Sequence, residues 1–233
     1  MGTHDVSKWI GCQLKQISII TRAENLYMIS AKEALERLRK GNQHFVEGTE
    51  RRDESITVHD RRSELAKGQK PFAVILGCSD SRVPAEIVFD QGLGDLFVIR
   101  VAGNIVAPSQ VGSVEFAATQ FETRLVVVLG HSQCGAILAT LEELHQPSGS
   151  RSPNLRSIVD RISPSVEPLL STGMANDSEV LVQQAVRANI RASANHLRHG
   201  SAILEQLIQD DGLLVVGAEY SLESGVVEFF DGV

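Results

Sequence analysis

Four short apolar segments, separated by long stretches with a helical period, constrain the fold of this chain most. They are residues 72–77, 96–101, 125–130 and 213–218. Their length and their Val, Ile and Leu content are typical of strands that are buried on both faces. Strands that alternate with helices form a parallel sheet with right-handed crossovers. A last run, residues 226–230, follows a turn cluster at Glu223-Ser224-Gly225 and predicts an edge strand. The predicted fold class is α/β: a central, mostly parallel sheet of four buried strands plus an antiparallel edge strand, flanked by helices.

The helical pattern begins near residue 30. Ser30 and Glu33 have the spacing of a capping box, and an apolar face then runs through Ala31–Glu47. Residues 1–27 show no clear period and are predicted to be a poorly defined N-terminal extension. Because composition does not change after that point, residues 28–233 are predicted to form a single α/β domain.

Composition excludes several classes of protein. The 233 residues carry a net charge of −7, with no basic cluster that would favour nucleic acid. No apolar stretch approaches the length of a membrane span, and no secretory signal is evident. There are three cysteines, an odd number, which argues against a disulfide framework and for a reducing, cytoplasmic location. Cys12 has no partner nearby in sequence and is expected to be a bystander thiol.

Polar side chains follow two of the predicted strands. Cys78 comes directly after the first strand, and His131 and Cys134 come at the end of the third. Sites in open parallel sheets form outside the carboxyl ends of the strands, so these side chains converge if the two strands are neighbours. Two cysteines and one histidine suit zinc, and three protein ligands leave the fourth tetrahedral position open, as in catalytic sites.

Three further residues belong to this predicted site. Asp80 lies two residues after Cys78, where it could occupy the fourth position or accept a hydrogen bond from zinc-bound water. Arg82 could hold the Asp80 carboxylate with a two-pronged hydrogen bond. Gly135 opens a helix directly after Cys134, so its amide is expected to face the zinc pocket, where a helix N-terminus favours a thiolate.

The sequence resembles the β-class carbonic anhydrases, whose ligand pattern is Cys-x-Asp-x-Arg followed by His-x-x-Cys on a later strand. Residues 78–82 and 131–134 match it at every fixed place, and the resemblance runs from about residue 33 to residue 220. The resemblance implies one Zn²⁺ per subunit and the reversible hydration of carbon dioxide to bicarbonate and a proton. It also implies that Asp80 and Arg82 are catalytic.

The resemblance implies substrate contacts as well. Gln69 matches a glutamine that donates a hydrogen bond to substrate in plant members, and Phe97 and Ala102 match positions that line the apolar substrate pocket. Gly135, whose amide is expected to face the zinc pocket, is predicted to bind substrate as well. Phe116 departs from the family, because plant-type enzymes have a Tyr here that reaches a neighbouring subunit's site. A homodimer or homotetramer is therefore expected. The helix at Ala31–Glu47 either packs on that second subunit, as in the family, or covers its own core.

A regulatory feature of some bacterial members bears on Asp80. In those enzymes the Asp leaves its Arg at lower pH and binds zinc, so Asp80 is a possible fourth ligand at lower pH. A bicarbonate pocket that includes a Trp accompanies this switch, and Ile75 stands at that place here. Inhibition by bicarbonate through that pocket is therefore not expected. Arg100 matches the pocket's Arg but is expected to pair at a subunit contact.

Two other functions stay open on the sequence. The same scaffold could hydrolyse another heterocumulene, such as carbon disulfide, and access to the zinc would decide between the substrates. Alternatively, Asp80 could complete a closed structural zinc site, and the protein would then be a binding module.

Overall fold

The computed structural model describes residues 29–49, 58–146, 152–173 and 177–233. A five-stranded sheet in the order β2-β1-β3-β4-β5 forms its centre. The first four strands run parallel, and β5 pairs with β4 antiparallel at the edge. Helices cover the sheet, so the predicted α/β fold class is confirmed.

The strands lie close to their predicted positions. They are β1 (Ala73–Gly77), β2 (Leu96–Arg100), β3 (Leu125–His131), β4 (Leu214–Tyr220) and β5 (Val227–Asp231). Every residue of β1 and β3 is buried, because both strands lie inside the sheet with helices over both faces. This explains why their sequences are continuous apolar runs rather than alternating patterns.

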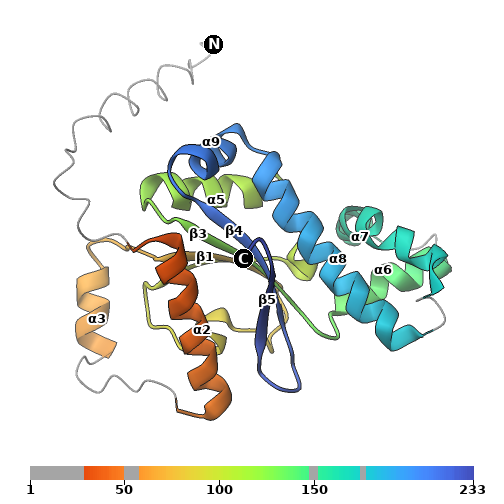
Figure 1. The fold of residues 1–233 in the computed structure, drawn as a ribbon, viewed down its shortest axis with the longest axis horizontal. Coiled ribbons are helices and arrows are strands. Elements are labelled where there is room, and N and C mark those ends of the chain that lie inside the picture. Colours follow the sequence, from red (N-terminus) through yellow and green to blue (C-terminus); the bar gives the residue numbers. More distant parts are fainter. Residues whose placement is uncertain (1–28, 50–57, 147–151, 174–176) are drawn as a thin grey trace.

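The helices divide between the two faces of the sheet. In chain order they are α2 (Ala31–Glu47), α3 (Val58–Leu65), α4 (Ala85–Val88), the 3-10 turn η1 (Ala102–Asn104), α5 (Pro108–Gln120), α6 (Gly135–His145), α7 (Pro153–Val166), the 3-10 turn η2 (Glu167–Ser171), α8 (Ser178–His199) and α9 (Ala202–Asp210). Figure 1 shows α5, α8 and α9 along one side of the sheet and α2 on the other. Alternate residues of β1 serve the two cores: Val74 and Leu76 pack with the α5–α9 side, and Ala73 and Ile75 with the α2 side.

Helix α2 covers the core of its own chain. The predicted capping box is present, since the Glu33 amide donates to the Ser30 hydroxyl and the Ser30 amide to the Glu33 carboxylate. Leu38 is fully buried, and the Asn42 amide donates to the carbonyls of Val88 and Gly225. The apolar face of α2 is therefore explained within one subunit, and the helix by itself does not require a second one.

Two elements were not anticipated. Helix α3 lies within the polar stretch before β1, and α9 follows α8 after a Ser201 cap whose hydroxyl accepts from the Leu204 amide. Leu204 is buried and Leu207 and Ile208 pack partly buried on the same core, so α9 has an apolar face that the sequence reasoning did not single out. Residues 1–27, with Cys12, lie outside the described residues, and the domain division at residue 28 stays a prediction. None of the helices in the described ranges is long and apolar enough to cross a membrane.

The close approach of α2 to the chain after α4 depends on Gly41. A Cβ atom at Gly41 would lie 1.8 Å from the Phe89 carbonyl oxygen, whereas a Cβ at Gly112, inside α5, would meet nothing within 4 Å. We expect Gly41→Ala to lower the free energy of unfolding by about 1–3 kcal/mol, because the helix must move outward. Gly112→Ala should raise it by up to about 1 kcal/mol through helix propensity. Urea unfolding of both variants checks this, and equal effects of the two substitutions would contradict it.

Candidate metal centre

The pairing of β1 with β3 brings the predicted ligands together. Gly77 lies opposite Leu129 in the parallel register, so Cys78 leaves β1 where β3 reaches His131. Cys134 follows after a tight loop and immediately precedes α6. The ligand atoms of Cys78, His131 and Cys134 all lie within 4.8 Å of one another, and all three side chains are buried. The predicted convergence of these three side chains is therefore observed.

The cluster fits a tetrahedral metal ion. The two sulfur atoms are 3.9 Å apart, and two Zn–S bonds of 2.3 Å at the tetrahedral angle require about 3.8 Å. His131 Nδ1 lies 2.8 Å from the Ser132 carbonyl oxygen, so it carries the proton and donates it there. This leaves the lone pair on Nε2, which is buried and has no hydrogen-bond partner in the described chain. A metal at this point would satisfy that nitrogen.

The two thiols share one proton in the metal-free chain. The hydrogen bond from Cys134 lowers the pKa of Cys78 to about 4 against the effect of burial, and the backbone amides of Asp80 and Gly103 lower it further. Donating that bond, together with burial, raises the pKa of Cys134. A divalent cation would displace this one proton from Cys134, because metal binding needs both thiolates.

Asp80 is held away from the cluster by Arg82. The Arg82 Nε and Nη2 atoms donate to the two carboxylate oxygens at 2.9 and 2.7 Å, and the Arg82 amide donates at 3.0 Å. These bonds hold the pKa of Asp80 well below its usual range. Asp80 Oδ2 is 3.8 Å from His131 Nε2, so the carboxylate stands beside the open side of the cluster. This is the two-pronged pairing predicted from the spacing.

Arg100 has a role that the sequence reasoning missed. Its guanidinium donates to the backbone carbonyls of Cys78 and Asp80 in its own chain, and its pairing at a subunit contact stays a prediction. Because Arg100 ends β2, next to β1, its side chain reaches the loop that carries both residues. A residue of the neighbouring strand therefore holds the loop after β1 in place. No local sequence pattern predicts this contact.

Comparison with known proteins identifies the family. A family model described as carbonic anhydrase matches residues 73–227. The solved β-carbonic anhydrase CcaA superposes with a TM-score of 0.67 and 28% identity, covering 85% of this chain and 95% of that one. The chain belongs to the β-carbonic anhydrase family. Carbonic anhydrase 2 of Mycobacterium tuberculosis is 38% identical, over 81% of this chain and 87% of its own length. A tetrameric β-carbonic anhydrase structure from Sordaria macrospora gives a TM-score of 0.65 at 25% identity, covering 72% and 85% of the two chains.

This β-carbonic anhydrase chain places only some of the expected substrate residues near the metal cluster. Ala102 opens η1, whose next residue, Gly103, donates its amide to Cys78 Sγ at 3.4 Å. Gly135 is the first residue of α6, and the space beside its Cα is open. The amides of Ala136 and Ile137, which follow it, act on the Cys134 sulfur. The expected helix N-terminus is thus present beside the thiolate, with its second and third residues in contact.

Gln69 and Phe97 lie away from the cluster in their own chain. Gln69 precedes β1, whereas Cys78 follows it, so the five-residue strand alone separates them by about 16 Å. Phe97 pairs with Val74 near the start of β1 and packs against Phe116 and Phe121 of the α5 region. Within one subunit neither side chain meets a substrate at its own metal cluster.

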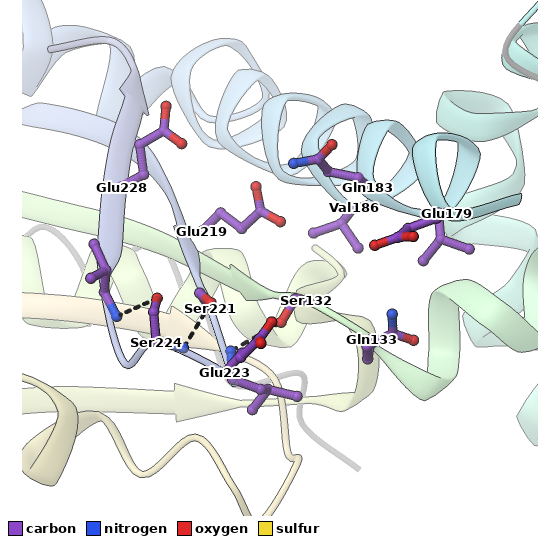
Figure 2. Close-up of a pocket in the computed structure, with 13 residues that line it drawn as sticks. Ser132, Gln133, Glu179, Gln183, Val186, Glu219, Ser221, Glu223, Ser224 and Glu228 are labelled. Carbon is purple, nitrogen blue, oxygen red and sulfur yellow. Dashed lines mark hydrogen bonds between the residues drawn. The ribbon is translucent and has the colours of Figure 1, made fainter. Parts of the chain in front are cut away.

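An acidic pocket adjoins the ligand loop. Its cavity volume is about 490 Å³ and it is lined by Ser132 and Gln133 but by none of the three cluster residues. Figure 2 shows carboxylates from α8, β4, the following loop and β5 around this hollow. Glu219 is the most enclosed of them, with 11% of its side chain exposed. Burial raises the pKa of Glu219, although Arg187, 3.7 Å away, opposes the shift.

The enclosed carboxylate makes the stability of the fold depend on pH. Because the pKa of Glu219 is raised on folding, stability is lost as the pH rises from the unfolded-state value, about 4.3, through the folded one. A glutamine side chain at this position carries no charge, so its burial causes no such loss of stability as the pH rises. We expect Glu219→Gln to be more stable than the wild-type chain at pH 7, with the difference shrinking as the pH falls to about 4. Denaturant titrations at several pH values check this. Glu223→Gln, an exposed change in the same pocket, is the control, and a difference independent of pH would contradict the prediction.

Proposed function

We propose that this protein is a zinc-dependent carbonic anhydrase that catalyses the reversible hydration of carbon dioxide to bicarbonate and a proton. The observation that carries the proposal is the buried cluster of Cys78, His131 and Cys134, beside an Asp80 carboxylate held by Arg82. The relatives are named carbonic anhydrases, and the family match spans the whole cluster. Because the reaction needs only water and a small apolar gas, a compact site of this kind is sufficient.

The two thiolates and His131 Nε2 would hold one Zn²⁺ per subunit. When bound, the ion lowers the pKa of a water molecule from about 16 to about 7, which supplies a nucleophile near neutral pH. The two thiolates together offset the ion's double charge, and the amides at the start of α6 and from Gly103 stabilise the sulfur atoms. The hydrogen bond from His131 Nδ1 to the Ser132 carbonyl fixes the ring orientation and leaves Nε2 as the nitrogen that would bind the ion.

Asp80 orients the attacking oxygen. Its Oδ2 atom lies 3.8 Å from His131 Nε2, so with an ion bound at that nitrogen Asp80 would accept a hydrogen bond from the nucleophile and orient it toward carbon dioxide. Arg82 keeps Asp80 ionised and fixes both carboxylate oxygens. At lower pH, Asp80 as a fourth ligand is part of the same proposal, since its Oδ2 atom lies only 3.8 Å from His131 Nε2.

The substrate pocket is proposed to form between subunits. Ala102 and Gly135 would line it from the chain that holds the metal. Gln69 and Phe97 lie too far away in that chain, so they would act on the site of a second copy. The solved relative from Sordaria macrospora is tetrameric, and Phe116, half exposed beside Phe97, offers an apolar surface for such a contact. A homodimer or homotetramer is therefore proposed, and light scattering that gives the monomer mass of 25.3 kDa at micromolar concentration would contradict it.

The two rival functions are less well supported. A closed structural zinc site would need Asp80 on the metal, but three hydrogen bonds from Arg82 occupy its carboxylate. Hydrolysis of carbon disulfide would use the same cluster, and the names of the relatives favour carbon dioxide. The free thiols of Cys78 and Cys134 support the proposed cytoplasmic location, because a reducing compartment keeps them available to a metal.

Removing one ligand tests the metal assignment. We expect Cys78→Ser to lose zinc and carbon dioxide hydration together, because a serine hydroxyl is a poor zinc ligand at neutral pH. Zinc content by atomic absorption and hydration by stopped flow are measured on the same preparation. Cys12→Ser is the matched control and should retain both. Stoichiometric zinc with full turnover in Cys78→Ser would refute the assignment.

Removing the partner of Asp80 separates metal binding from catalysis. We expect Arg82→Ala to keep its zinc but to hydrate carbon dioxide at least about 10-fold more slowly, because Asp80 is freed to turn onto the metal. Arg156→Ala removes an exposed arginine from a surface ion pair with Asp160 and should have little effect on rate. Wild-type turnover in Arg82→Ala would show that the pair has no catalytic role.

A further inference from the structure

The turn η1 brings a backbone donor to the first thiolate of the cluster. Gly103 donates its amide to Cys78 Sγ at 3.4 Å, in a buried position. Its φ of 68° lies in the left-handed region, and a Cβ atom there would come within 2.8 Å of Ile162 and 3.0 Å of Ala136. Only glycine fits this conformation and this space, so the approach of the amide to the sulfur requires glycine at position 103.

Helix α8, more than eighty residues further along the chain, donates hydrogen bonds to the carbonyl groups of that turn. The Asn189 side chain donates from Nδ2 to the Gly103 carbonyl oxygen at 2.8 Å. The Ser193 hydroxyl donates to the Asn104 carbonyl oxygen at 3.0 Å. Asn189 and Ser193 are one helical turn apart and face the same way, and both are buried, with exposures of 2% and 6%. Two consecutive carbonyls of η1 are thus tied to one face of α8.

The same face of α8 also packs against β3 just before His131. Ile190, which is fully buried, lies directly against Gly130, so α8 packs closely on the sheet at this point. Helix α8 therefore contacts Gly130, which precedes His131, and Gly103, whose amide donates to Cys78. Asn189 and Ser193 both hydrogen-bond to η1. Burying an amide side chain lowers stability unless it is hydrogen-bonded, and apolar side chains alone would be enough to pack α8 on the sheet.

We propose that Asn189 is a positioning residue for the metal centre: by holding the Gly103 carbonyl it keeps the Gly103 amide on the Cys78 thiolate. An amide that points at sulfur stabilises the thiolate and tunes its bond to the metal, as other outer hydrogen bonds do at metal sites. Without Asn189, residue 103 is free to rotate and the amide leaves the sulfur. The inference rests on the proposed metal site, and its test distinguishes the failure of one from the failure of the other.

Cobalt replaces zinc as the probe, because a Co²⁺–thiolate centre absorbs light by charge transfer from sulfur. We expect Asn189→Ala to move this band to longer wavelength, since a thiolate without its hydrogen bond gives up its electron more easily. Affinity for Zn²⁺, measured by competition with a chelating dye, should fall by about 10-fold or more. Neither readout depends on turnover.

Asn42→Ala is the matched control. Asn42 is also a buried asparagine that donates to backbone carbonyls, but it lies on the α2 side of the sheet and serves the β5 turn. It should lower the unfolding midpoint and leave the cobalt band and zinc affinity unchanged. If Asn189→Ala does not fold, Ser193→Ala, which removes one hydroxyl from the same turn, is measured in its place.

The results of these measurements distinguish the proposal from a general loosening of the fold and from the absence of a metal site. A shifted band and weaker zinc binding in Asn189→Ala or Ser193→Ala, with Asn42→Ala unchanged, support the proposal. A wild-type band and wild-type affinity in the α8 variant overturn it while the proposed metal site stands. Equal shifts in the α8 variant and Asn42→Ala would also overturn it, because they would show a general loosening of the fold. A wild-type chain without any thiolate band would overturn both the metal site and this inference.

Discussion

The parallel pairing of β1 with β3 is the contact on which the rest of the site depends. Both strands are buried on both faces, so neither can shift its register without exposing apolar side chains or driving them into the opposite core. That register sets Cys78 beside His131, although the two residues are more than fifty positions apart in sequence. The hydrophobic effect that builds the sheet is thus also the force that assembles the metal cluster.

The polar groups around the cluster are satisfied by backbone atoms more often than by side chains. Gly103 donates to one sulfur, the start of α6 acts on the other, and the Ser132 carbonyl sets the tautomer of His131. Backbone groups cannot titrate and move little, so they hold the cluster in one geometry. Asp80 is the exception, because its position depends on an exposed arginine side chain, and this makes it the part of the site that is able to move.

Helix α8 links the two sides of the ligand strand. One face of it holds η1 through Asn189 and Ser193, and another lines the acidic pocket with Glu179 and Gln183 beside Ser132 and Gln133. Its packing against Gly130 fixes both contacts relative to β3. A change in the burial or charge of α8 would therefore alter the positions of the backbone groups around the cluster, even though α8 contributes no ligand.

The sequence by itself determined the fold class, the strand positions and the α2 capping box, because each rests on local periodicity or on close spacing. It also offered the two halves of the predicted ligand set, residues 78–82 and 131–134, but their convergence depended on the pairing of β1 with β3. The Asp80–Arg82 pair was also readable, since two residues in one loop meet whatever surrounds them. Only the tertiary structure decided what reaches the cluster from elsewhere: Arg100 from β2, Gly103 from η1 and Asn189 from α8. It also decided that α2 covers its own core, and that Gln69 lies at the far end of β1 from Cys78. Long-range contacts such as these depend on strand order and helix packing, which no local pattern encodes, and that is the physical reason they could be found only once the chain was folded.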